Sequence, residues 1–171
     1  SLQRLTRTVD ALNRTNRLSY DENGHLTATL DPLSLAIRQQ FDADGNRVGI
    51  VNSKNAATTF AFDLAGRLTN SVTPTGKTTS YELDGRNLLT RITQPSGAQT
   101  TLTYDAAGRL IRSQDAVGTI TNTYDMKGRL LSVSENGWTC RYQYGPVDRL
   151  TNYVDAASNT LRYAYDAVGN L

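Results

Sequence analysis

The residues of this chain that could do chemistry are few, and most of them recur. Aspartate precedes arginine by four residues in three similar segments: Asp63–Arg67, Asp105–Arg109 and Asp125–Arg129. A carboxylate beside a cation could serve as an acid-base pair. An enzyme needs one such pair in a pocket, whereas the same pair repeated along the chain indicates a structural role. We therefore predict exposed ion pairs across turns, which add little to stability.

Two single residues invite a chemical interpretation, and each has a simpler one. His25 is the only histidine and occupies the place of Arg67 and Arg109. We expect a solvated partner of Asp21 rather than a catalytic base. Cys140 falls on an apolar strand face, which predicts a small buried hydrophobic residue. A single cysteine also excludes an internal disulfide framework and a cysteine-rich metal site.

Two short patterns resemble known sites without completing them. Residues 42–46, Asp-Ala-Asp-Gly-Asn, resemble the opening of a calcium loop. Glycine, however, stands at the fourth position instead of the sixth, and the twelfth residue, Ser53, has no carboxylate. Residues 13–15 form a glycosylation sequon by pattern only. The sequence therefore predicts no catalytic, cofactor-binding or metal-binding residue, and no enzyme activity.

Composition excludes further classes of protein. A chain of 171 residues is normally one domain that can bury a core. Its formal charge of +2, from 18 basic and 16 acidic residues, gives no excess of basic residues of the kind that binds nucleic acid. The sequence contains no apolar run of about 18 residues, the length that could span a membrane. The chain begins Ser-Leu-Gln-Arg, without Met or a signal peptide, so we expect a fragment of something longer.

An internal repeat of about 21 residues dominates the sequence. Aromatic residues mark it at Tyr20, Phe41, Phe62, Tyr104, Tyr124, Tyr144 and Tyr165. A second series lies midway: Asp10, Asp31, Asn52, Thr73, Gln94, Asp115, Glu135 and Asp155. On this spacing Leu83 replaces the missing aromatic residue, Asn87 replaces the glycine four residues later, and Tyr81 takes the position two before the aromatic.

The segment Asp-x-x-Gly between strand-like runs predicts a type I turn closed by a residue with positive φ, which forms a G1-bulge hairpin. Asn87 should adopt that conformation, with Asp84 opening its turn. The aromatic residue should pair across the strands with the leucine after the turn, as in Tyr104–Leu110.

Period-2 alternation then predicts an apolar face with the aromatic residues and an opposite polar face. The polar face should include Arg17, Arg38, Arg141 and Arg162. Apolar residues of the returning strands fit this pattern less well and are expected on the polar side: Val48, Ile50, Ile111, Leu131 and Val133.

About eight such repeats make roughly 16 antiparallel strands, and a sheet of more than about ten strands must curl. We therefore predict an all-β fold over 1–171: a single array of β-hairpin repeats in a coiled, curved sheet, with strands paired in chain order.

These motifs resemble the YD or Rhs repeat family. Tyr-Asp-x-x-Gly-Arg-Leu is complete at 104–110 and 124–130 and nearly complete at 20–26, 62–68 and 165–171. The family includes bacterial Rhs and wall-associated proteins, toxin-complex components and teneurins. The resemblance implies part of a hollow shell that, in bacterial members, encloses a C-terminal toxin. It also implies a secreted or cell-surface location.

Three classes of function follow. The first is a non-catalytic segment of an encapsulating shell, whose partners are the rest of that shell and its toxin. The second is an adhesion or carbohydrate-binding module, for which Trp138, Tyr142, Tyr153 and Tyr163 form a suggestive aromatic cluster. The third, an enzyme, lacks a convergent polar constellation. Unpaired strand edges at both ends further predict that the isolated segment self-associates.

Overall fold

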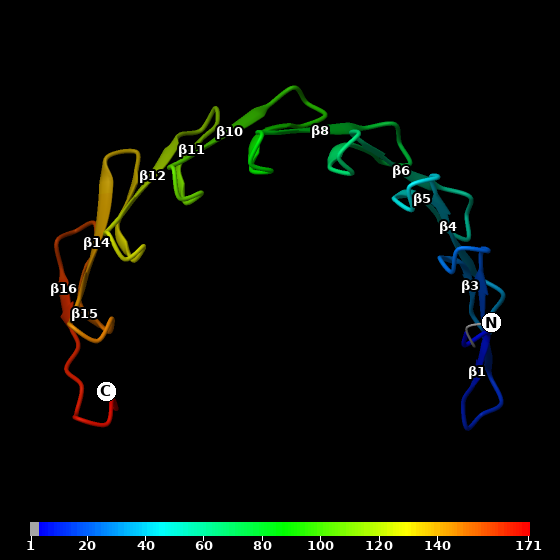
Figure 1. Cartoon of the computed structure of the whole chain (residues 1–171), viewed down its shortest axis with the longest axis horizontal. Coiled ribbons are helices and arrows are strands. Elements are labelled where there is room, and N and C mark those ends of the chain that lie inside the picture. The colour runs from blue at the N-terminus through cyan, green and yellow to red at the C-terminus, as the bar shows by residue number, and fades with distance from the viewer. Residues whose placement is uncertain (1–3) are drawn as a thin grey trace. The chain divides into compact units, whose positions relative to one another are not determined.

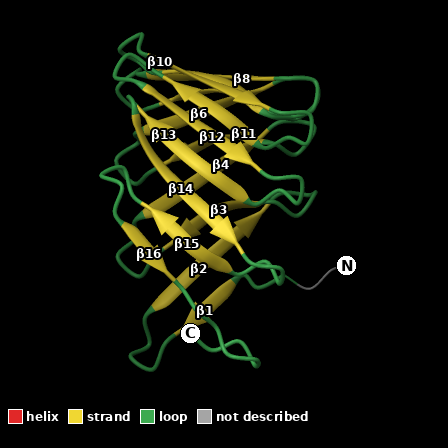
Figure 2. Cartoon of the chain, turned by 90° about the vertical axis from the view of Figure 1, so that its left-hand side faces the viewer, coloured by secondary structure: helices red, strands yellow, loops and turns green. Residues whose placement is uncertain are grey.

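The computed structural model describes residues 4–171, and within them the chain forms strands, turns and no helix (Figure 1 and Figure 2). The sixteen strands are β1 (Arg7–Val9), β2 (Thr15–Tyr20), β3 (Leu26–Leu30), β4 (Ala36–Phe41), β5 (Arg47–Val51), β6 (Ala57–Phe62), β7 (Leu68–Val72), β8 (Thr78–Leu83), β9 (Leu89–Thr93), β10 (Gln99–Tyr104), β11 (Leu110–Gln114), β12 (Thr119–Tyr124), β13 (Leu130–Glu135), β14 (Trp138–Tyr144), β15 (Leu150–Val154) and β16 (Thr160–Arg162). Two strands make each repeat, as predicted.

The strands follow one another in the sheet in chain order, from β1 to β16, and neighbours are antiparallel. The predicted all-β meander of hairpins is therefore confirmed. The chain divides into two compact units. The first ends at Glu82 and also takes in residues 94–96, and the second covers residues 83–93 and 97–171. Within the second unit alone, β10 to β16 bend the sheet progressively, as strand twist requires (Figure 1).

Neither unit encloses a hydrophobic core. Among residues 4–171 no apolar side chain is buried, although many are half-buried. The expectation that a chain of this length buries a core is therefore wrong here. Within each unit the strands contact only their neighbours in the chain, so among residues 4–171 no second layer of strands covers either face of a unit. Its stability depends instead on backbone ladders and on contacts between neighbouring strands.

The turn at residues 84–87 behaves as the repeat spacing predicts. Asn87 has a φ of 69°, and its N–H donates to the carbonyl oxygen of Asp84 at 3.1 Å. The Asp84 carboxylate accepts the N–H groups of Arg86 and Leu88, both at 2.9 Å. Asn87 thus replaces the turn glycine, because asparagine is the side chain that best tolerates positive φ.

The bulge after each such turn explains why the returning strands fit the alternation poorly. Tyr124 pairs with Leu130 and Thr123 with Ser132, so Leu131 is the additional residue of the bulge. Val48 and Ile111 occupy the same position in their hairpins.

Beyond the bulge the alternation is displaced by one residue. Val133 pairs with Asn122, and Ile50 pairs with Gln39, both on the face that carries the aromatic residues. The prediction that Ile50 and Val133 lie on the polar face was wrong, since one inserted residue inverts the period-2 pattern.

Candidate functional site

The aspartate–arginine pairs are one half of a contact that joins each repeat to the next. The carboxylate of Asp105 accepts a hydrogen bond from Nε of Arg109 at 2.6 Å and from the Arg109 backbone N–H at 3.0 Å. The same guanidinium lies 4.8 Å from the ring centroid of Tyr124 in the following repeat. Its Nη1 donates to the carbonyl oxygen of Asp125 at 3.1 Å. We call this arrangement the inter-repeat clamp.

The clamp recurs where the same residue types recur. Arg129 pairs with Asp125 at 2.6 Å and lies 4.8 Å from the ring of Tyr144. Arg4 and Arg149 lie over Tyr20 and Tyr165, at 5.7 and 5.3 Å. Tyrosine hydroxyls add a bond in the reverse direction: those of Tyr104 and Tyr124 donate to the carbonyl oxygens of Leu89 and Leu110, at 2.9 and 3.0 Å. Where these residue types recur, side chains from both repeats therefore contribute to the contact between neighbours.

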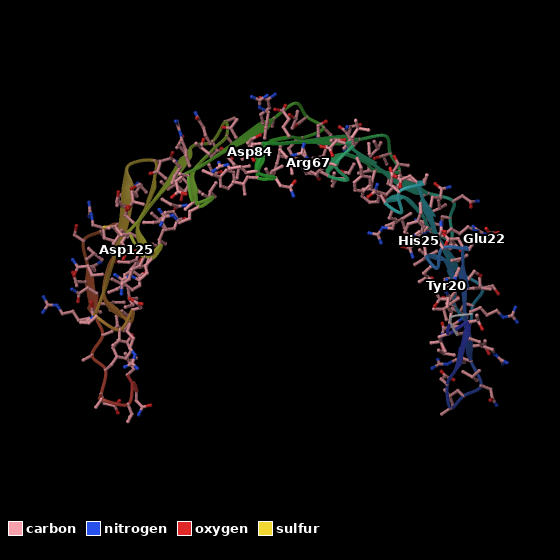
Figure 3. All side chains as sticks on the ribbon, viewed as in Figure 1. Tyr20, Glu22, His25, Arg67, Asp84 and Asp125 are labelled. Carbon is pink, nitrogen blue, oxygen red and sulfur yellow. The ribbon has the colours of Figure 1, made fainter. Side chains whose placement is uncertain are left out.

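His25 takes the clamp position in the first unit. Its Nδ1 is 2.9 Å from the Asp21 carboxylate, so the predicted partner is the observed one. Its ring stacks on Phe41 of the next repeat with centroids 4.6 Å apart. The side chain is about one third exposed. His25 is thus an aromatic substitute for the clamp arginine. Figure 3 shows it together with Arg67 and the turn aspartates Asp84 and Asp125.

One departure from the repeat pattern is compensated by its neighbour. Asp148 stands where other copies have the turn glycine, and it has a φ of 61°. Its carboxylate accepts Arg129 Nη1 at 2.6 Å and Lys127 Nζ at 2.8 Å. The guanidinium group of Arg129 therefore binds two carboxylates, that of Asp125 in its own repeat and that of Asp148 in the following repeat.

The electrostatics of the clamps are those of satisfied carboxylates. The backbone N–H of Arg109, followed by its side chain, holds the pKa of Asp105 below its ordinary value, although partial burial acts to raise it. The side chain of Arg67 lowers the pKa of Asp63 in the same way. A general acid at neutral pH needs a raised carboxyl pKa, so these groups have the electrostatics of structural anchors.

The aromatic cluster near the C-terminal end lies on one face of the second unit. Tyr142 and Tyr153 pair across β14 and β15, and their rings are 5.4 Å apart. The Tyr153 hydroxyl donates to Sγ of Cys140 at 3.4 Å, and this contact, with burial, raises the pKa of Tyr153 to about 12. Cys140 is half-buried rather than buried. Trp138, on the same face, is 65% exposed.

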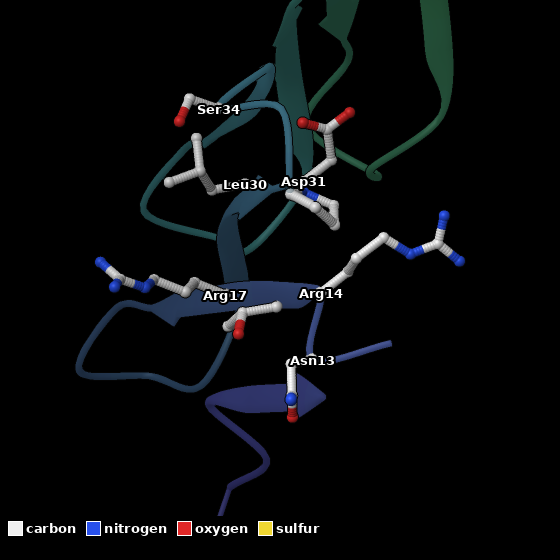
Figure 4. Close-up of a pocket in the computed structure, with 8 residues that line it drawn as sticks. Asn13, Arg14, Arg17, Leu30, Asp31 and Ser34 are labelled. Carbon is white, nitrogen blue, oxygen red and sulfur yellow. The ribbon is translucent and has the colours of Figure 1, made fainter. Parts of the chain in front are cut away.

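The charged side chains around a hollow of the first unit do not converge. A hollow of about 450 Å³ in the first unit is lined by Arg14, Arg17 and Asp31 among others (Figure 4). Its two arginine side chains point away from each other, and Arg14 is held by Asp10 at 2.7 Å. Within residues 4–171 no group of three or more His, Cys, Asp or Glu side chains is placed to hold a metal ion. The same residues include no helix that could cross a membrane.

Sixteen sequential strands paired as hairpins in residues 4–171 define a β-hairpin repeat protein. The profile of the RHS repeat matches residues 20–58, 62–98, 84–120 and 124–160, which is most of the chain. The chain therefore belongs to the RHS repeat family. A comparison with curated proteins gave no match.

Solved structures share the fold. A chain in the crystal structure of TcdB2-TccC3-TEV has a TM-score of 0.71 and 20% identity over 91% of this chain. A Tc holotoxin pore of Photorhabdus luminescens gives 0.71 and 17% over 87%. TcdB2-TccC3 without its hypervariable C-terminal region gives 0.55 and 17% over 91%. The chain spans only 10%, 9% and 11% of those chains, so the likeness concerns the fold of one portion.

Proposed function

We propose that this chain is a non-catalytic wall segment of a shell that encloses a polypeptide, commonly a toxin, in a secreted or cell-surface bacterial protein. The observation that carries this proposal is the inter-repeat clamp. The conspicuous polar residues of the repeat, such as Asp105 and Arg109, are used to attach one hairpin pair to the next. A chain built in this way extends a sheet, and extending a sheet is what a wall requires.

The open faces of the sheet support the same proposal. A sheet with no buried apolar side chain in residues 4–171 is a poor self-contained globule but a suitable single-layer wall. The structural neighbours named after Tc toxin components, which share the fold, point in the same direction.

The test is protection of the enclosed polypeptide in the full-length parent protein. One specific protease site is placed in the polypeptide that follows the repeats, and another in the exposed turn at Leu64 as a positive control. We expect cleavage at the turn, and cleavage of the polypeptide only after the shell is unfolded. Equal rates at the two sites in the native protein would contradict enclosure.

A second candidate function is carbohydrate binding on the aromatic face. It is favoured by Trp138, which stands exposed beside the Tyr142–Tyr153 pair on one face of β14 and β15. Aromatic rings of this kind present flat apolar surfaces to sugar rings. Glycan-array binding that is lost in Trp138→Ala but kept in Trp138→Phe would support this function. An array without signal would eliminate it.

The two outermost strands favour self-association of the segment on its own. β1 and β16 have three residues each, all exposed, and each pairs with one strand only. Unpaired strand edges are templates for another chain. Sedimentation of the isolated segment should show species larger than the monomer, and Thr160→Pro should reduce them. A single monomeric species at all concentrations would refute this expectation.

A further inference from the structure

The second unit separates its charges between the two faces of its sheet. Five residues within β9 to β16 are charged: Arg91, Arg112, Glu135, Arg141 and Arg162. The register places Arg112 opposite Thr103 and Thr121, Arg141 opposite Ser132, and Arg162 opposite Asn152. These positions, with that of Arg91, lie on the face opposite the aromatic residues. We call this surface the arginine face.

No carboxylate of these strands reaches the arginine face. Glu135 pairs with Trp138 and Ile120, which places it on the aromatic side. All thirteen aspartates of the chain lie in turns rather than in strands: Asp10, Asp21, Asp31, Asp42, Asp44, Asp63, Asp84, Asp105, Asp115, Asp125, Asp148, Asp155 and Asp166. The small net charge of +2 therefore conceals a locally cationic surface, because the aspartates are confined to the turns.

Three of these arginines differ from the arginines of the clamps. Arg112, Arg141 and Arg162 are exposed, and none of them forms an ion pair within the described part of the chain. Arg109 and Arg129, by contrast, are held by Asp105 and Asp125 at 2.6 Å. The clamp arginines are already satisfied, whereas the guanidinium groups of Arg112, Arg141 and Arg162 are free to bind external anions.

The side chains around these three arginines are almost all short and polar. Arginine alternates on this face with hydroxyl and amide groups: Thr101, Thr103, Gln114, Thr121, Ser134, Gln143 and Asn152. β14 and β16 are two strands apart, so Arg141 and Arg162 are separated by roughly 10 Å across the sheet. Guanidinium groups bind sulfate, phosphate and carboxylate by two parallel hydrogen bonds. The surrounding hydroxyls and amides suit the hydroxyl groups of a sugar.

We propose that the arginine face of the second unit binds an anionic polysaccharide. This surface lacks the aromatic platforms on which single-stranded nucleic acid stacks its bases. It also lacks the buried apolar anchors that dominate protein interfaces, since no apolar side chain in residues 4–171 is buried. A flexible, highly charged and hydroxylated polymer needs neither. The proposal is independent of the wall function and of sugar stacking on the aromatic face, because it concerns the opposite surface.

The experiment measures binding of the chain to immobilised heparin, used as a sulfated polysaccharide, with dextran as the uncharged comparison. The test variant combines Arg112→Gln, Arg141→Gln and Arg162→Gln. The matched control combines Arg47→Gln, Lys54→Gln and Lys77→Gln, which removes the same charge from exposed positions outside the arginine face. Arg47 pairs with Phe41 on the aromatic side, and the two lysines lie in turns.

We expect the wild-type chain to bind heparin but not dextran, with affinity falling as salt is raised. The test variant should lose roughly tenfold or more in affinity, while the control stays within about twofold. If the triple variant does not fold, Arg141→Gln alone should weaken binding, and Arg141→Lys should restore it only in part, because lysine keeps the charge but cannot form two parallel hydrogen bonds.

Three results would overturn the proposal. The first is no heparin binding at low salt. The second is an equal loss in both triple variants, which would show a response to net charge alone. The third is tighter binding of polyglutamate or of a single-stranded polynucleotide than of heparin, which would assign the face to an acidic protein or to nucleic acid.

Discussion

Two rows of turns join the strands, and they differ in what lies against them. The clamp-row turns follow the aromatic residues, and the mid-repeat turns lie half a repeat away. Both rows make the same backbone hydrogen bonds. The N–H of Gly45 donates to the carbonyl oxygen of Asp42 at 3.2 Å, and that of Gly76 donates to the carbonyl oxygen of Thr73 at 2.9 Å. The positive-φ position is nevertheless glycine in six of eight clamp-row turns, whereas mid-repeat turns also use asparagine and serine there, as at Asn13 and Ser34.

Packing explains the difference. A Cβ atom added to Gly45 would lie 3.2 Å from Nε2 of His25, which belongs to the preceding repeat. A Cβ atom added to Gly76 would meet nothing within 4 Å. Glycine in the clamp row therefore satisfies two demands, the positive φ and the closely packed side chain of the preceding repeat. At Gly76, Gly97 and Gly137 of the mid-repeat turns a Cβ atom would meet nothing within 4 Å, so these positions impose only the first demand, which other small polar residues meet.

Acidification should affect the clamp row most, and it is the largest effect we expect. Hydrogen bonds from neighbouring residues, against the opposing effect of partial burial, lower the pKa of seven clamp-row aspartates: Asp21, Asp42, Asp63, Asp84, Asp105, Asp125 and Asp166. Since the folded pKa is depressed, their contribution is complete above the unfolded value near pH 4 and is lost as pH falls through the folded pKa.

Urea midpoints measured from neutral pH down to about pH 3 should fall steeply below about pH 4. Hydrogen exchange at low pH should report earlier opening at the clamp-row turns than at the turn around Gly76. A midpoint that does not change with pH would contradict the assignment of these carboxylates as anchors.

Single aspartate substitutions should destabilise the clamp-row turns more than the mid-repeat turns. Asp105→Ala removes the acceptor for the N–H groups of Ala107 and Arg109 and the partner of the Arg109 side chain. Asp115→Ala removes two N–H acceptor bonds only, to Val117 and Gly118. The urea midpoint should fall further for Asp105→Ala. Asp105→Asn, which keeps an acceptor but not the ion pair, should lie in between, and equal losses at both sites would show that the clamp adds nothing.

Alanine at a turn glycine measures the contribution of packing directly. Gly45→Ala and Gly76→Ala both place alanine at positive φ, which costs roughly 1–2 kcal/mol. Gly45→Ala should cost more, since His25 must move from its stack on Phe41. His25→Ala provides the control, because in that background the two glycine substitutions should cost the same. A larger cost at Gly76 would refute the packing explanation.

The smallest effect concerns Asn87. Asn87→Gly should change the unfolding free energy by less than about 0.5 kcal/mol, because easier positive φ is offset by a more flexible unfolded chain. Asn87→Ala should cost about 1 kcal/mol. Thermal or urea unfolding measures both. A loss on Asn87→Gly comparable to that of Asn87→Ala would mean that the asparagine side chain, and not its backbone, is what this turn requires.

Local features of the fold follow from the sequence alone because they depend on neighbouring residues. The spacing of aromatics and turn residues predicted the hairpins, the strand order and the positive φ of Asn87. The pairing of Tyr104 with Leu110 was also predictable, since turn type determines register in a hairpin. The pairing of His25 with Asp21 followed from the same logic.

Only the tertiary structure decided what crosses between repeats. The reach of Arg109 to Tyr124 depends on how two hairpins are offset and twisted, which no local pattern specifies. The faces of Ile50 and Val133 depended on a bulge that inverts the alternation the sequence displays. The absence of a buried core in residues 4–171 and the position of Arg112 on the face opposite the aromatic residues have the same origin. Both depend on which strands become neighbours, and pairing between strands is a property of the whole sheet.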